Sequence, residues 1–282
     1  MQQYKTLLKA LYRLYEHSGF TMAGAVAFSF VLSLFPFCIF LGALAGVFGG
    51  RALAERAVAQ LFLVMPEAVA QALAPQVNAI MGATRIDLLT IGGAIALFFA
   101  TNAIETMRAA LNGAYRVMET RPYPLCLMIS MLFVLVNALS SLVITWLLVV
   151  GPAIAREFEP DWMHQVTESS LWTSGWRYAT AAAVLAVELF AFHLWLAAGR
   201  RRVQDVWPGV LLSVLLWLLV AGLYSFYLSF SDYTRFYAGL SQLMVALIFF
   251  QVTAVIMILG AELNRGIMEI KRLRNGDTSS FE

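Results

Sequence analysis

Charged residues are scarce in this chain of 282 residues. Asp, Glu, Lys and Arg together make up 13% of the sequence, about half of their share in soluble domains. The formal net charge is +2, whereas nucleic-acid-binding domains concentrate much more positive charge on one surface. The composition excludes an ordinary soluble domain and predicts no nucleic-acid partner.

Residues that build metal or reactive centres are also few. The two cysteines, Cys38 and Cys126, lie in apolar segments and indicate no disulfide framework. The three histidines, His17, His164 and His193, fall in three different segments of the chain, so they are not expected to share a metal ion. No P-loop motif for ATP occurs. We therefore expect no cofactor, no metal site and no enzymatic activity.

What the chain does have is long apolar runs, since 61% of its residues are hydrophobic. Each run contains about the 20 residues that a helix needs to cross the hydrocarbon core of a bilayer. The sequence thus predicts an all-α polytopic membrane protein, with residues 1–274 as a single membrane domain and 275–282 as a flexible tail. The six predicted spans cover residues 21–49, 86–104, 125–152, 177–198, 207–230 and 239–263.

The Lys and Arg residues alternate between the two sides of these spans. With a cytoplasmic N-terminus, thirteen of the 19 fall in cytoplasmic stretches and the other six in outer loops. Cytoplasmic loops of membrane proteins carry such an excess of Lys and Arg. Both termini are therefore predicted in the cytoplasm, and the bacterial inner membrane is the expected location.

Short interfacial helices are expected beside the spans. Residues 1–20 place Leu7, Leu8, Leu11, Leu14 and Tyr15 at helical spacing, which is typical of an amphipathic helix on a membrane surface. Residues 51–85 predict two short outer helices separated at Pro66 and Pro75.

Three stretches carry a family resemblance. AVAFSFVLSLFPF (25–37) ends in an S-L-F-P run, AALNGAYRVMETRP (109–122) fits an A-L-N-x-x-Y-x-x-x-x-x-R-P element, and residues 237–264 contain an apolar span ending in L-G-A-E. In this order they resemble the YihY/BrkB family of bacterial inner-membrane proteins, once mislabelled as ribonuclease BN. The resemblance implies six transmembrane helices and a role in envelope biology, with transport of a lipid or other envelope component suspected. It implies no catalytic site.

Glu188 is the clearest candidate for a functional residue. It lies near the middle of the fourth predicted span with no basic residue within one helical turn. Ionisable groups at this depth cost roughly 2.5 to 3.5 kcal/mol on insertion scales, so they usually serve a function or pair with another helix. One interpretation is a proton-coupling or substrate-amine site, and the other is a carboxyl group hydrogen-bonded to a neighbouring helix.

A polar stripe marks the cytoplasmic end of the second span. Helical geometry places its residues within about 120° of one another. Glu105 and Arg108 are expected to pair at i,i+3, and Asn112 to add hydrogen bonds. The stripe predicts either a network that holds helix ends together or the lining of a cytoplasmic vestibule. Its members are Asn102, Glu105, Arg108, Asn112 and Arg116.

The last span carries a second polar pair, Gln251 and Glu262, which lie three turns apart on one face. We expect this face to meet the stripe of the second span, with Arg108 or Arg265 as the partner of Glu262. These positions and Glu188 favour a transporter or flippase of an amphiphilic envelope molecule. The competing hypothesis is a non-transporting scaffold or regulator of envelope assembly. Membrane lipids are the expected partners, and the oligomeric state is left open.

Overall fold

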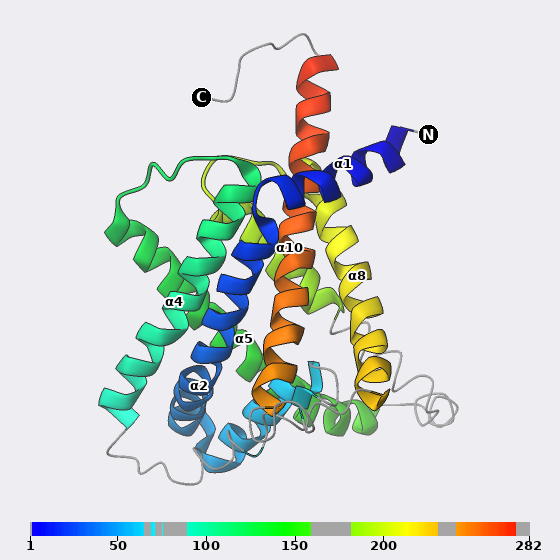
Figure 1. The fold of residues 1–282 in the computed structure, drawn as a ribbon. Helices are drawn as coiled ribbons and strands as arrows, with labels where there is room; N and C mark the ends of the chain where they lie inside the picture. The colour runs from blue at the N-terminus through cyan, green and yellow to red at the C-terminus, as the bar shows by residue number, and fades with distance from the viewer. Residues whose placement is uncertain are drawn as a thin grey trace.

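The computed structural model describes residues 2–64, 69–70, 75, 89–158, 182–230 and 241–274. Within these ranges every regular element is a helix. Long helices run side by side as a bundle, and the first helix lies at the same end as the end of the last (Figure 1). We call this the α1 end of the bundle. The prediction of an all-α protein is thus confirmed, and the predicted tail at 275–282 lies outside the described residues.

The principal helices follow the predicted spans. They are α1 (Gln2–Glu16), α2 (Gly19–Val64), α4 (Leu89–Tyr115), α5 (Tyr123–Phe158), α8 (Val203–Phe230) and α10 (Ser241–Arg274). Five of them contain a segment long and apolar enough to cross a membrane: Gly19–Leu41, Gly93–Tyr115, Tyr123–Leu142, Val203–Val220 and Leu243–Arg274. The fourth predicted span corresponds to a shorter apolar helix, Ala182–Leu196. Five of the six predicted spans therefore have helices of spanning length.

One boundary differs from the prediction. The first span was expected to end at residue 49 and to be followed by a separate short helix, but α2 continues to Val64. The residues after Gly50 alternate Ala with Leu, Glu and Arg, which are all good helix formers, so the helix propagates through the two glycines. Between residues 64 and 89 the structure describes only residues 69–70 and 75, so the second predicted outer helix is almost entirely outside the described residues. Residues 159–176, between the third and fourth predicted spans, also lie outside them.

Close backbone contact joins α8 to α10. Gly209 and Gly260 face each other where these helices cross, and a Cβ atom on Gly209 would overlap the carbonyl oxygen of Gly260. Small residues allow such an approach, which gives membrane helices the close packing that replaces a hydrophobic driving force. Ser213 adds a hydrogen bond from its hydroxyl to the carbonyl oxygen of Ile256, 3.2 Å away. The two helices therefore form one rigid unit at the α1 end.

Candidate polar network and Glu188

The predicted pair of Glu105 and Arg108 is present on α4. The Arg108 guanidinium donates to both carboxylate oxygens of Glu105, and Nε lies 3.3 Å from Oε1. Ser130 of α5 donates its hydroxyl to the same carboxylate. Glu105 is therefore shared between two helices, and the side chains of Glu105 and Arg108 are 14% and 11% exposed. The i,i+3 prediction is confirmed.

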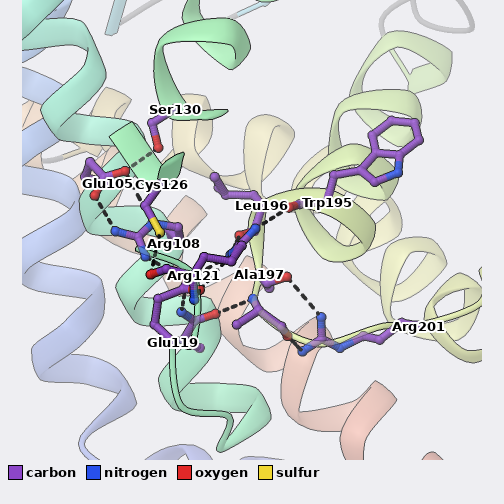
Figure 2. A network of polar contacts seen from close by, with 12 residues as sticks. Glu105, Arg108, Glu119, Arg121, Cys126, Ser130, Trp195, Leu196, Ala197 and Arg201 are labelled. Atoms are coloured by element: carbon purple, nitrogen blue, oxygen red, sulfur yellow. Dashed lines mark hydrogen bonds and ion pairs between the residues drawn. The ribbon is translucent and has the colours of Figure 1, made fainter. Parts of the chain in front are cut away.

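Glu119, in the loop between α4 and α5, is the centre of this network (Figure 2). Its carboxylate accepts hydrogen bonds from Arg121 Nε at 2.7 Å, Arg108 Nη1 at 2.7 Å and Asn112 Nδ2 at 3.1 Å. The hydrogen bonds from Arg121 are the largest cause that lowers the pKa of Glu119 well below its ordinary value. Glu119 in turn raises the pKa of Arg121. The predicted hydrogen bonding of Asn112 is confirmed, with a partner that the sequence did not indicate.

The helix that carries Glu188 ends abnormally. Its last turn, Phe192–Leu196, is a π-helix, and the chain becomes extended at Ala197. A helix end leaves carbonyl oxygens without internal partners. Arg121 donates to two of them, from Nη1 to Trp195 at 3.2 Å and from Nη2 to Leu196 at 2.8 Å. The loop after α4 thus supplies the cap for this helix (Figure 2).

Arg201 caps the same end from the other side. Its guanidinium lies 3.6 Å above the centre of the Tyr115 ring, as in a cation–π contact. Burial lowers the pKa of Arg201, and the carbonyl dipoles stabilise its charge. Its acceptors are the carbonyl oxygens of His193, Ala197 and Ala198, the last at 2.7 Å. Asn112 completes the cap, because its Oδ1 accepts the Ala198 N–H at 2.7 Å.

Buried polar side chains extend this network to α8 and α10. The Tyr115 hydroxyl lies 2.9 Å from His193 Nδ1 and accepts a hydrogen bond from Asn264 Nδ2 at 3.3 Å. Asn264 Oδ1 accepts the Gly209 N–H at 2.6 Å. His193 and Asn264 are completely buried. The network therefore holds together α4, α5, α8, α10 and the broken helix.

Glu262 belongs to a second cluster, under α1. Its side chain is 1% exposed and lies 3.7 Å from Arg116 Nη2. Arg108, one of its two predicted partners, is instead occupied by Glu105 and Glu119. Arg116 follows the last residue of α4 and has a φ of 53°. This turn takes Arg116 out of the helical stripe, and its side chain lies beside Glu262 of α10. Arg265, the other predicted partner, is buried and acts on Glu262 through its charge.

Glu188 stands apart from both clusters. Its side chain is partly buried, and no hydrogen bond or ion pair connects it to any other residue in the described ranges. Asn102 and Gln251 are exposed on the surface of the bundle. The structure therefore brings Glu105, Arg108 and Asn112 together, places Glu262 in a separate cluster, and leaves Glu188, Asn102 and Gln251 outside both.

Several residues of the network were not identified as candidates from the sequence. Glu119 and Arg121 lie in a short loop, and Arg201 lies in a run of three arginines that resembles an ordinary topological signal. One sequence pattern could have identified part of the network: the A-L-N-x-x-Y-x-x-x-x-x-R-P element. Its polar positions are Asn112, Tyr115 and Arg121, and all three are members of the network.

No metal site is visible in the part of the chain that the structure describes, where no three His, Cys, Asp or Glu side chains gather. Cys38 and Cys126 are buried as free thiols. His193 is bonded to Tyr115, and His17 lies beside Arg116 near the end of α1.

Comparison with known proteins gives two matches and one negative result. The family model described as virulence factor BrkB matches residues 10–280. Among curated proteins, the chain is 28% identical over 274 residues to YfkH of Bacillus subtilis (strain 168), whose name describes it as ribonuclease-like. That alignment covers 95% of this chain and 97% of the relative. No solved structure matches.

Proposed function

We propose a transport function for this chain, which belongs to the virulence factor BrkB family: it moves an amphiphilic envelope molecule, such as a lipid, across the bacterial inner membrane. Its long apolar helices make it a multi-pass membrane protein. In the proposed orientation the α1 end faces the cytoplasm, since this end carries most of the Lys and Arg residues.

The observation that supports the proposal is the contrast between Glu188 and the other described carboxylates of the bundle interior. Glu105 and Glu262 each lie beside an arginine, and so does Glu119 at the bundle end. Glu188, in an apolar helix, has no such partner among the described residues. A carboxyl group that is expensive to keep in a membrane and is not used to join helices is a candidate for proton coupling or for binding a substrate amine.

The polar network has a different part in this proposal. Its carboxylates, guanidiniums and carbonyl oxygens are bonded to one another, so they have little capacity left for a substrate. We assign to it the role of a fixed frame that holds the end of the Glu188 helix. Asn102 and Gln251 remain candidates for contact with the amphiphile, because both are exposed in apolar helices.

A scaffold or regulator of envelope assembly is the second candidate function. The dense pairing of Glu105, Arg108 and Asn112 favours it, because a vestibule would leave such groups free for a ligand. We propose no enzymatic activity in either case. The ribonuclease-like name is that of the Bacillus relative.

Reconstitution of the purified protein into vesicles tests the transport proposal. The vesicles contain phosphatidylethanolamine and phosphatidylglycerol, and a fluorescent analogue of each lipid reports movement between leaflets. We expect movement above protein-free vesicles for the wild type and a fall to the protein-free rate for Glu188→Gln. Glu16→Gln, an exposed carboxylate on α1, should retain the wild-type rate.

Each outcome separates the hypotheses. If the wild type does not exceed protein-free vesicles with either lipid, transport of phospholipids is refuted and the scaffold function is favoured. If the wild type is active and Glu188→Gln is equally active, the protein is a transporter in which Glu188 has only a structural role.

A further inference from the structure

Helix α1 has three different faces. Ala10 and Leu14 are buried against the bundle, 2% and 1% exposed. Lys9 and Glu16 form an exposed polar face. The third face spans about 100° around the helix and is apolar and exposed. We call it the outer face of α1, and it consists of Leu8, Leu11, Tyr12 and Tyr15, which are 61%, 44%, 66% and 76% exposed.

Exposed apolar residues continue along the chain from the outer face of α1 into the first span. Phe20, directly after the turn at Ser18, is 49% exposed, and Phe28 and Leu32 of α2 are 60% and 46% exposed. The last two are exposed on a segment that is long and apolar enough to cross a membrane, so we expect lipid to surround them. Helix α1 itself lies across the end of the bundle rather than along it (Figure 1). Such a helix can rest in the headgroup boundary with its apolar side toward the acyl chains.

The opposite side of α1 closes over buried charges. Arg13 Nη2 forms an ion pair with Glu269 Oε2 of α10 at 2.9 Å. His17 Nδ1, at the turn after α1, lies 2.8 Å from Arg116 Nη2. Beneath these contacts Glu262 is almost completely buried beside Arg116. The same face of α10 is exposed at Gln251, three turns deeper in the bundle.

From these contacts we infer that α1 is a cover seated on the lipid surface. Its outer face binds the bilayer, and its inner face keeps the Glu262 carboxylate, which lies beside Arg116, away from water. The Arg13–Glu269 pair is partly exposed, with side chains 23% and 35% accessible, and such pairs contribute little alone. The cover is therefore held jointly by the lipid contact and the ion pair. This inference does not depend on the proposed transport function.

The lipid contact is tested with spin labels at neighbouring positions of α1. Tyr15→Cys places a label on the outer face, and Glu16→Cys places the control about 100° away on the polar face. Both native cysteines are buried, so the new thiols are labelled selectively in phosphatidylethanolamine–phosphatidylglycerol vesicles. The label at position 15 should be relaxed mainly by oxygen, and the label at 16 mainly by a water-soluble nickel chelate. Equal access of the chelate to both labels would contradict the contact between the outer face and the bilayer.

The cover is tested by reversing the ion pair. Arg13→Glu should increase backbone hydrogen exchange in residues 258–266 of α10 at least tenfold. The double variant Arg13→Glu/Glu269→Arg should restore slow exchange. Lys271→Glu removes a different ion pair at the end of α10, with Asp205 at 3.3 Å, and should leave this exchange unchanged. The inference is contradicted if residues 258–266 exchange at the wild-type rate in Arg13→Glu. It is also contradicted if the Lys271→Glu control shows the same tenfold increase. If Arg13→Glu does not fold, the double variant decides the test. The inference is then contradicted if the double variant does not recover both folding and slow exchange.

Discussion

Arg121 Nη2 donates a hydrogen bond to the carbonyl oxygen of Leu196 at 2.8 Å, across 75 residues of sequence. The loop between α4 and α5 is thereby fastened to the end of the Glu188 helix. One planar guanidinium donates hydrogen bonds to a carboxylate and to two carbonyl oxygens at once. The fork geometry of arginine suits this task, and the single ammonium group of lysine does not.

Replacement of Arg121 by Lys should therefore destabilise the protein although the charge is retained. We expect a loss of about 2 kcal/mol, because several charge-assisted hydrogen bonds are broken and a helix end is left uncapped. Thermal unfolding in detergent measures the effect. The matched control is Arg202→Lys, at an exposed position in the same arginine run, which should unfold within error of the wild type. If both variants unfold at the same temperature, the guanidinium geometry of Arg121 is not required for stability.

The carboxylate of Glu119 should make stability depend on pH in a defined direction. Its pKa in the folded protein is lowered, chiefly by Arg121. The charged form therefore contributes stability above the ordinary carboxyl pKa, and this contribution is lost as the pH falls toward the lowered value.

Comparison of the wild type with Glu119→Gln isolates this contribution. The variant should be less stable by about 2 kcal/mol at neutral pH, because hydrogen bonds to a charged group are lost. The difference in the free energy of unfolding between the two proteins should be constant between pH 8 and 6. It should become smaller below about pH 4, where the carboxyl groups of the unfolded chain become protonated. Unfolding midpoints measured across this range test the prediction, which fails if the difference grows in acid.

Crowding between α8 and α10 predicts a severe effect for one small substitution. Gly209→Ala would push a methyl group into the Gly260 carbonyl and the Asn264 amide. Backbone atoms cannot move aside cheaply, so a loss of more than about 3 kcal/mol is expected. Gly24→Ala on α2 is the control, since nothing lies within 4 Å of its added Cβ. It should be neutral or slightly stabilising, and purification yield with thermal unfolding distinguishes the two variants.

The hydroxyl of Tyr115 can be removed without removing its ring. Tyr115→Phe keeps the surface on which Arg201 lies but leaves His193 Nδ1 and Asn264 without this shared partner. The expected loss is roughly 1 to 3 kcal/mol, the cost of unpaired buried polar groups. Tyr123→Phe, at a position that is 67% exposed, should change stability by less than about 0.5 kcal/mol. A neutral Tyr115→Phe variant would mean that water replaces the hydroxyl.

Much of the fold could be predicted from the sequence because the length of an apolar run and the spacing of residues along a helix are local properties. The Glu105–Arg108 pair was predictable for the same reason, because a separation of three positions on one helix brings the two side chains together. The partner of Glu262 was not, because it depends on the φ of 53° at Arg116, which no spacing rule gives. The extent of α2 was missed because the prediction ended the helix with the apolar run, near Gly50, whereas the helix continues through the alanine-rich sequence that follows.

The centre of the polar network depends on a loop and on a broken helix. Glu119 becomes its main acceptor only when the chain turns back after Tyr115, and Arg201 becomes a cap only because the preceding helix ends in a π-turn. Periodicity predicts a regular helix through Ala198, so it gives no indication of the free carbonyl oxygens. Glu188 was recognised from the sequence by its isolation, which the structure retains among the described residues.

The charges of the network also determine how it responds to an electric field. Glu105, Arg108, Glu119 and Arg121 contribute two negative and two positive charges, and Arg201 adds one positive charge outside the apolar segments. The four paired groups together experience almost no force from the transmembrane voltage, and Arg201 lies at the end of the bundle, where little of that voltage falls. A proton that reaches Glu188 from either side moves charge through that voltage, which amounts to about 2.3 kcal/mol per 100 mV for a full crossing. Transport that requires protonation of Glu188 should therefore vary with membrane voltage, whereas the frame that supports its helix should be insensitive to it.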